Sequence, residues 1–190
     1  MDVTAQTICM TDTETVQAPV LVLGLGNILL QDEGVGVAVI ERLQRRYRVP
    51  DEVELLDGGT SGMSLLEDIR NREHVIVVDA VRTGKPAGTE VVLTGEEVPA
   101  FLCNKVSPHQ LALSDVLANL LLMNESPHQV TVVGMEPLSL ETHLGLSKLV
   151  ASRLQSLTDR VIEQIEAAGY HVEPLAREAW NNNFSLMTEA

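Results

Sequence analysis

The sequence predicts an α/β protein, with a single three-layer α/β/α domain built on a mostly parallel five-stranded sheet. Two patterns carry this prediction. Short continuous apolar runs, such as residues 20–23, 75–78 and 130–133, are typical of strands that are buried on both faces. Apolar residues recur at helical spacing between these runs. Strands that alternate with helices favour a parallel sheet with helices on both of its faces.

The first half of the domain follows this alternation closely. A strand at residues 20–23 precedes a helix that begins near Asp32, a favourable N-cap, and ends before Pro50. The apolar stripe of this helix is predicted to be Val35, Val39, Leu43 and Tyr47. A second strand at 53–56 is followed by a third at 75–78, with a helix between them. The inward-facing residues of that helix are predicted to be Met63, Leu66 and Ile69.

A short fourth strand at residues 90–93 is expected at an edge of the sheet, in antiparallel orientation. The helix that follows has a well-marked start. Ser107 is the predicted N-cap, Pro108 takes the first helical position, and Gln110 completes a capping box. The buried stripe of this helix is predicted to be Leu113, Leu117 and Leu120.

The fifth strand, at residues 130–133, leads to a last helix that starts near Ser147 and ends before Gly169. Its predicted apolar face is Val150, Leu154, Leu157, Val161 and Ile165. These elements place the folded domain at residues 19–174. Residues 1–18 and 175–190 are polar and lack a hydrophobic period, so we expect a disordered leader and a flexible tail.

Composition narrows the possible partners. The chain has 190 residues with 27 acidic against 13 basic side chains, a net charge of −14, which argues against a nucleic-acid or anionic-membrane surface. No secretory signal is evident, and the apolar stretch at 117–123 is too short to span a bilayer. The two cysteines form no disulfide framework. We therefore expect a cytoplasmic protein, and a monomer because no apolar stripe is left unassigned.

Three ionisable residues are placed where a ligand site is expected. Glu33 follows the first strand, Asp79 closes the third apolar run, and His109 lies in the first turn of a predicted helix. Open α/β sheets bind ligands outside the carboxyl ends of their strands, and two carboxylates with an imidazole suit a divalent metal. Two of the three also have a structural explanation: Glu33 as a partner of the helix dipole, and His109 as a satisfied polar residue. Asp79 closes a buried apolar run and must find partners at the rim of the sheet. Their joint placement favours a metal site.

Other motifs are weaker. Gly24-x-Gly26 suggests a dinucleotide loop, but Leu29 occupies the third glycine position and two acids would repel a pyrophosphate at the helix start. The turn at 57–60 has glycines that allow close approach by another chain, or it is an ordinary strand-to-helix turn. Neither the G-x-S-x-G nucleophile elbow of serine hydrolases nor the H-E-x-x-H motif of zincins is present.

Four motifs in series resemble the nickel-iron hydrogenase maturation endopeptidases. They are Gly24-Leu25-Gly26-Asn27-Ile28-Leu29-Leu30 with Asp32-Glu33-Gly34-x-Gly36-Val37, then Asp57-Gly58-Gly59-Thr60, Val78-Asp79-Ala80 and Ser107-Pro108-His109-Gln110. The resemblance covers about residues 20–174. It implies a five-stranded sheet between helices. It also implies cleavage of a C-terminal extension from the hydrogenase large-subunit precursor after nickel insertion.

The resemblance assigns roles to particular residues. Glu33, Asp79 and His109 correspond to the metal ligands, while Asp57, Gly58, Gly59 and Thr60 correspond to a substrate-handling loop. A ligand set without thiolate has a modest affinity for nickel, so we expect the precursor to bring the nickel to the site. We also expect that another divalent ion can occupy the site in vitro. Catalysis is open between metal activation of water or carbonyl and a general base such as Asp57 or Glu33. The alternative function is a non-proteolytic nickel-sensing chaperone.

Overall fold

The computed structural model describes residues 17–99 and 108–176, and within the helix at 108–123 it describes side chains from Leu113 onward. A five-stranded sheet runs through the centre in the order β3-β1-β4-β6-β5. Its strands are β1 Val20–Leu25, β3 Val53–Gly59, β4 His74–Ala80, β5 Glu90–Thr94 and β6 Gln129–Met135. The first four in spatial order are parallel, and β5 pairs antiparallel with β6 at the edge. The predicted α/β fold is confirmed.

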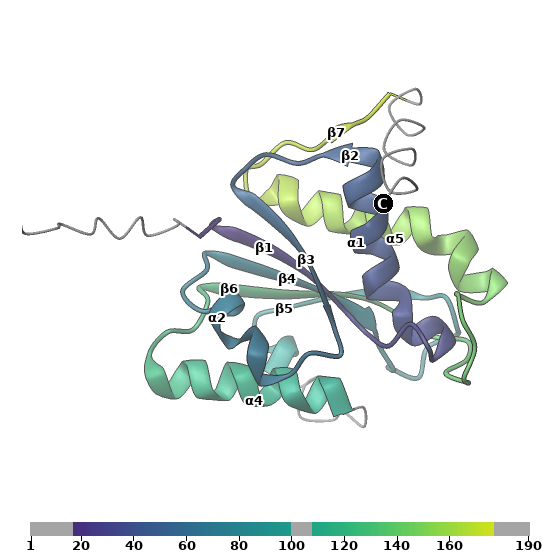
Figure 1. Cartoon of the computed structure of the whole chain (residues 1–190), viewed down its shortest axis with the longest axis horizontal. Helices are drawn as coiled ribbons and strands as arrows, with labels where there is room; N and C mark the ends of the chain where they lie inside the picture. The colour runs from purple at the N-terminus through teal and green to yellow at the C-terminus, as the bar shows by residue number, and fades with distance from the viewer. Residues whose placement is uncertain (1–16, 100–107, 177–190) are drawn as a thin grey trace, which may run out of the picture.

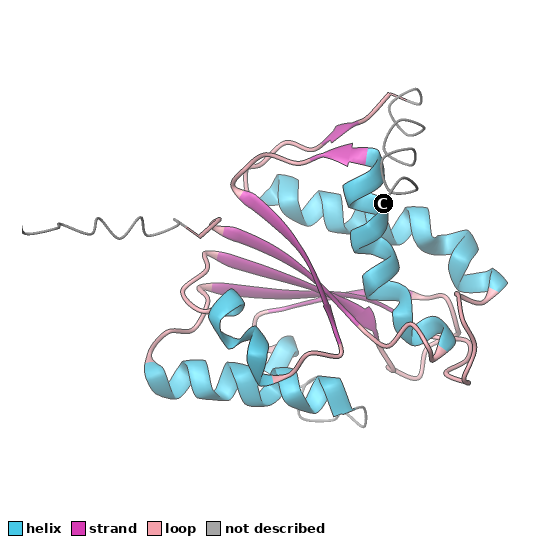
Figure 2. Cartoon of the chain, in the orientation of Figure 1, coloured by secondary structure: helices cyan, strands magenta, loops and turns pink. Residues whose placement is uncertain are grey.

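Helices cover both faces of this sheet (Figure 1). On one face lie α1, Val35–Arg46, and α5, Lys148–Ala167, and on the other lie α2, Leu66–Ile69, and α4, Pro108–Met123. Figure 2 shows the strands as a twisted central layer between the two helical layers. Alternate residues of β4 enter opposite cores: Ile76 and Val78 pack with α1 and α5, while Val75 and Val77 pack with α4.

Most predicted elements lie where the sequence placed them. The last helix has Ser147 as its N-cap, whose side chain accepts a hydrogen bond from the backbone N–H of Val150 at 3.3 Å. Its predicted apolar residues enter the core, although Leu154 is only partly buried. The helix α4 begins at Pro108 as predicted, whereas the predicted cap Ser107 lies outside the described residues. No helix among the described residues is long and apolar enough to cross a membrane.

Two predictions about the apolar faces of the helices are wrong. Tyr47 is not helical, because α1 ends at Arg46 and the chain enters the short strand β2, Tyr47–Arg48, which pairs antiparallel with β7, Glu173–Pro174. Met63 does not face inward. It begins a 3₁₀ turn, η2, Met63–Leu65, whose tighter winding changes which residues face the sheet. Met63 is therefore 49% exposed and Leu65 is buried in its place.

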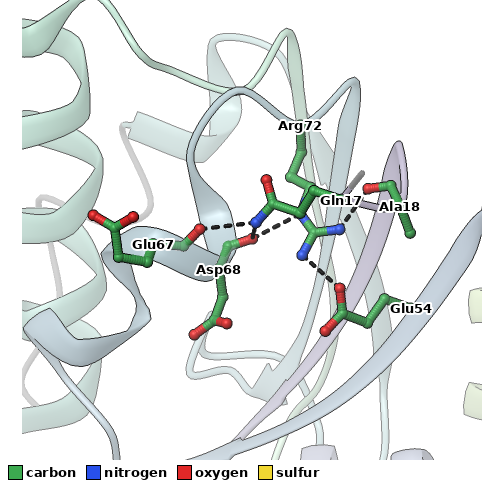
Figure 3. Close-up of polar contacts among 6 residues, drawn as sticks. All are labelled: Gln17, Ala18, Glu54, Glu67, Asp68 and Arg72. Atoms are coloured by element: carbon green, nitrogen blue, oxygen red, sulfur yellow. Dashed lines mark hydrogen bonds and ion pairs between the residues drawn. The ribbon is translucent and has the colours of Figure 1, made fainter. Parts of the chain in front are cut away.

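A buried arginine joins the amino-terminal ends of the strands (Figure 3). Arg72 donates to the backbone carbonyls of Ala18, just before β1, and of Asp68 in α2, the latter at 2.7 Å. It also pairs with the carboxylate of Glu54 in β3. Its side chain is only 2% exposed, so these acceptors replace the water that a guanidinium would otherwise bind. Arg72 therefore ties three separate segments together at this edge.

Candidate functional site

The segment that carries Glu33 lies directly on the end of β1. After Leu25 the chain turns and forms a short 3₁₀ helix, η1, Gln31–Gly34, which leads into α1. Gly26 has a φ of +128°, and a Cβ added there would lie 1.8 Å from the carbonyl oxygen of Glu33. Only glycine permits this approach. As a result, the backbone of Glu33 is held against the end of β1, and its side chain is buried.

A second close approach brings the same segment to β4. A Cβ on Gly36 would lie 2.2 Å from the carbonyl oxygen of Val78, the residue before Asp79. A Cβ on Gly24 would lie 2.6 Å from the carbonyl oxygen of Gly36. The glycines of the first motif therefore allow α1 and η1 to pack directly on the sheet. This packing accounts for the pattern that suggested a dinucleotide loop.

Asp79 lies inside β4, one residue before its end, and is 2% exposed. It shares its side of the sheet with Val75 and Val77, which is the side covered by α4. The strand β1 lies between β3 and β4, because the chain passes from β1 to one neighbour and then crosses to the other. Glu33, after β1, and Asp79, near the end of β4, thus lie where these two strands meet at the topological switch point, where open α/β sheets bind ligands.

His109 lies in the first turn of α4. This helix starts on the side where the parallel strands end (Figure 1), so the backbone of His109 belongs to the same edge as Glu33 and Asp79. Its side chain lies outside the described part of the structure. Among the side chains that are described, no group of three or more His, Cys, Asp or Glu is arranged to hold a metal ion. Two carboxylates are a fitting but incomplete donor set for a divalent ion, and the three-ligand site stays a prediction.

The predicted substrate loop lies beside β1. Asp57, Gly58 and Gly59 end the strand β3, and the carbonyl oxygen of Gly59 accepts a hydrogen bond from the N–H of Gly26 at 2.9 Å. The exposed carboxylate of Asp57 accepts from the N–H of Gly59 at 3.0 Å. Asp57 is level with Val78 on the far side of β1, about 10 Å away at two strand spacings. It therefore borders the same edge, on the opposite side of β1 from β4.

The prediction that Asp32 is a helix N-cap is wrong, and its side chain has a different role. Its carboxylate is 1% exposed and accepts three backbone N–H groups from the segment after β6. Oδ2 accepts from Leu138 at 3.0 Å and Ser139 at 3.1 Å, and Oδ1 accepts from Ser147 at 2.7 Å. In the sequence, an acidic residue at a helix start is fully explained by its own helix. The actual partners of Asp32 are more than 100 positions away. No local signal indicated them.

Glu136 is a carboxylate for which the sequence predicted no role. It follows β6, is 8% exposed, and accepts from both the N–H and the hydroxyl of Thr83, at 2.7 and 2.8 Å. Its own N–H donates to the carbonyl of Thr89 at 2.9 Å. Glu136 therefore holds the loop that leaves β4 just after Asp79. A charged residue directly after an apolar strand run was the only available signal.

The fold and this edge define a doubly wound α/β protein with buried carboxylates at its switch point. Within that class, the chain belongs to the hydrogenase maturation protease family, whose conserved pattern matches residues 37–164.

Individual relatives agree with this assignment. The chain is 49% identical over 161 residues to the hydrogenase 2 maturation protease of Escherichia coli K12, covering 84% of this chain and 97% of that protein. It is 40% identical over 155 residues to the hydrogenase expression/formation protein HupD of Rhodobacter capsulatus, covering 80% and 74%. Among solved structures, the hydrogenase maturating endopeptidase HybD from E. coli superposes with a TM-score of 0.79 at 47% identity, covering 82% and 96%.

Proposed function

We propose that this protein is an endopeptidase that removes the C-terminal extension of a nickel-iron hydrogenase large-subunit precursor after nickel insertion. The observation that carries the proposal is the placement of two buried carboxylates, Glu33 and Asp79, at the switch-point edge of a chain in the hydrogenase maturation protease family. The first two motifs of the resemblance, around residues 24–34 and 57–60, lie on the same edge.

Nickel is proposed to arrive as part of the substrate. Glu33, Asp79 and His109 would supply two carboxylates and one imidazole, a set that binds nickel modestly compared with thiolates. Nickel already held by cysteines of the precursor has open positions that these three side chains complete. Docking then places the peptide bond at the edge only when the precursor is loaded. The endopeptidase would thus act as a check on nickel insertion.

The position of Asp57 favours a role in handling the substrate chain. Its carboxylate is exposed, lies across β1 from Asp79, and already accepts the N–H of Gly59. In the scheme in which the metal serves recognition alone, Glu33 is the nearer candidate for general base, since it is buried on the same edge as Asp79. Asp57→Ala separates the roles: weakened precursor binding supports substrate handling, and lost cleavage with full binding assigns Asp57 to the chemistry.

Intact mass spectrometry of the products tests the function. The purified protein is mixed with large-subunit precursor that is either nickel-loaded or nickel-free. We expect loss of one C-terminal peptide from the loaded precursor alone. A stable complex without any change in mass would instead identify a nickel-sensing chaperone. Equal cleavage of both precursors would reject nickel recognition while keeping the peptidase.

His109→Ala is the matched test of the third ligand. We expect it to abolish processing while the urea unfolding midpoint stays close to that of the parent protein, because His109 lies in the first turn of α4 rather than in its middle. Normal processing by this variant would remove His109 from the proposed site.

A further inference from the structure

Four large apolar side chains are exposed next to the turn that carries Glu33. Ile28 and Leu29 are each 55% exposed, Leu138 is 57% exposed and Leu144 is 70% exposed. We call these four residues the rim patch. They come from two segments, the turn after β1 and the loop between β6 and α5. Apolar side chains gathered on one surface commonly mark an interaction site, whereas scattered ones need no explanation.

The two segments of the rim patch are joined through their backbones. The N–H of His143 donates to the carbonyl of Leu29, and the N–H of Gln31 donates to the carbonyl of His143, both at 3.0 Å. These bonds form a short parallel bridge between Leu30 and His143. The side chains of Leu29 and Leu144 are therefore carried on paired backbone rather than on independent loops.

Asp32 completes the attachment. Its buried carboxylate takes the N–H groups of Leu138, Ser139 and Ser147, and its own N–H donates to the carbonyl of Ser139 at 3.2 Å. Hydrogen bonds to a charged acceptor are stronger than neutral ones. Since Asp32 and Glu33 are adjacent in η1, the loop that carries Leu138 and Leu144 is positioned directly from the proposed catalytic segment.

We infer that the rim patch is the docking surface for an apolar segment of the hydrogenase precursor, and that Asp32 is the positioning residue that holds this surface in place. The inference deepens the proposed function and rests on it. Because Glu33 and Asp79 are buried, a chain to be cut must approach them from the sheet edge, beside the rim patch. Ile28 and Leu29 lie on the same segment as Glu33, and the loop that carries Leu138 and Leu144 is bonded to that segment. All four side chains are uncharged, so the patch fits an apolar segment rather than a charged one.

The double variant Leu29→Gln/Leu144→Gln tests the docking surface. We expect the Kd for nickel-loaded precursor, measured by calorimetry, to rise about tenfold or more, with KM following and kcat unchanged. The matched control is Leu122→Gln in α4, which removes a side chain that is 86% exposed but outside the rim patch. An unchanged Kd in the double variant, or an equal loss in Leu122→Gln, would overturn the inference.

Ionic strength provides an independent readout. Docking through apolar side chains should vary little between about 50 and 500 mM salt, whereas docking driven by the net charge of −14 should weaken steeply. A steep loss of affinity that is identical in the parent protein and the double variant would contradict an apolar docking surface.

Asp32→Asn tests the positioning role, because the amide keeps the volume but presents an N–H₂ group where N–H donors converge. We expect faster hydrogen exchange at the amides of Leu138, Ser139 and Ser147, and a higher Kd for precursor. Combined with Leu29→Gln/Leu144→Gln, the effects on Kd should be less than additive, since both act through one surface. Additive effects would reduce Asp32 to a purely structural residue. Precursor binding without cleavage by the parent protein would reject the peptidase and leave this surface standing.

Discussion

Buried charged residues of opposite sign, Arg72 and Asp32, hold segments together at the two ends of the parallel strands. At the amino-terminal edge Arg72 donates to the carbonyls of Ala18 and Asp68 and to Glu54. At the carboxyl-terminal edge Asp32 accepts amides from the loop between β6 and α5. Both side chains replace their lost hydration with protein partners. Both also join segments that are distant in the sequence.

Arg72 and Asp32 join different kinds of segment. Arg72 connects the start of β1 to β3 and α2, elements whose side chains enter the two cores. Asp32 connects a turn to a loop, and the four rim-patch side chains that these two segments carry remain exposed. We therefore expect Arg72 to stabilise the fold and Asp32 to position a surface. Substitutions at the two edges should separate stability from activity.

Glu33→Gln is expected to have the largest effect of all. The amide keeps the shape of the side chain but is neither a base nor an anionic ligand, so the rate of precursor cleavage should fall about a thousandfold. The free energy of unfolding should change by less than about 1 kcal/mol, because a buried carboxylate is itself costly. Intact mass spectrometry over time measures the first quantity and urea unfolding the second. Cleavage within tenfold of the parent rate would remove Glu33 from the catalytic group.

Arg72→Met should show the opposite profile. Loss of the guanidinium leaves two carbonyls without their donor and one carboxylate without its partner, so we expect a loss of about 2–3 kcal/mol in the free energy of unfolding. Cleavage per folded molecule should be unchanged. Arg70→Met is the matched control, since Arg70 is 41% exposed, pairs with the exposed Glu67 at 3.2 Å and lies 3.8 Å from Glu125, and should contribute about 0.5 kcal/mol or less. A cleavage defect in folded Arg72→Met would break the separation of the two edges.

His74 gives the smallest expected effect, again on stability alone. It begins β4, and burial lowers its pKa from the ordinary value of about 6.5 while its Nε2 lies 2.9 Å from the hydroxyl of Thr131. Below pH 6.5 the unfolded chain therefore takes up this proton more readily than the folded chain. Stability should decline as the pH falls from 6.5 toward the folded pKa, and then level off.

The pH dependence of urea unfolding measures this contribution. His74→Gln should flatten the profile below pH 6.5, whereas His128→Gln, which changes an exposed histidine, should leave it unaltered. Identical profiles in the parent protein and His74→Gln would show that the buried imidazole does not control acid sensitivity.

Much of the fold was predictable because it follows from periodicity and short-range signals. The strands at Val20, Val75 and Val130 are apolar runs buried on both faces, and the α5 start at Ser147 is a side-chain cap. The edge position of Glu33 and Asp79 follows from chain order and the right-handed crossover alone. Met63 and Tyr47 were misplaced because a 3₁₀ turn and a two-residue strand changed the winding within a few residues.

The attachments at the two edges were not predictable in the same way. Arg72 lies in a charged stretch that is typical of an exposed surface. Two of its three partners are backbone carbonyls, which have no sequence signature. Asp32 had a complete local interpretation as a helix N-cap. Gly36 was visible as part of a motif, but its contact with the carbonyl of Val78 depends on how α1 crosses the sheet. Such roles arise only from long-range packing.

The contact between Gly36 and Val78 also bears on when the chain can act. Glu33 belongs to the first βα unit and Asp79 to the third strand of the parallel sheet in chain order, so their approach requires β4 to have crossed over and paired with β1. Non-local pairings of this kind form late, after the entropy of closing the intervening chain has been overcome. A nascent or partly unfolded chain therefore has no assembled pair of carboxylates. Folding itself is therefore the step that brings the two carboxylates together.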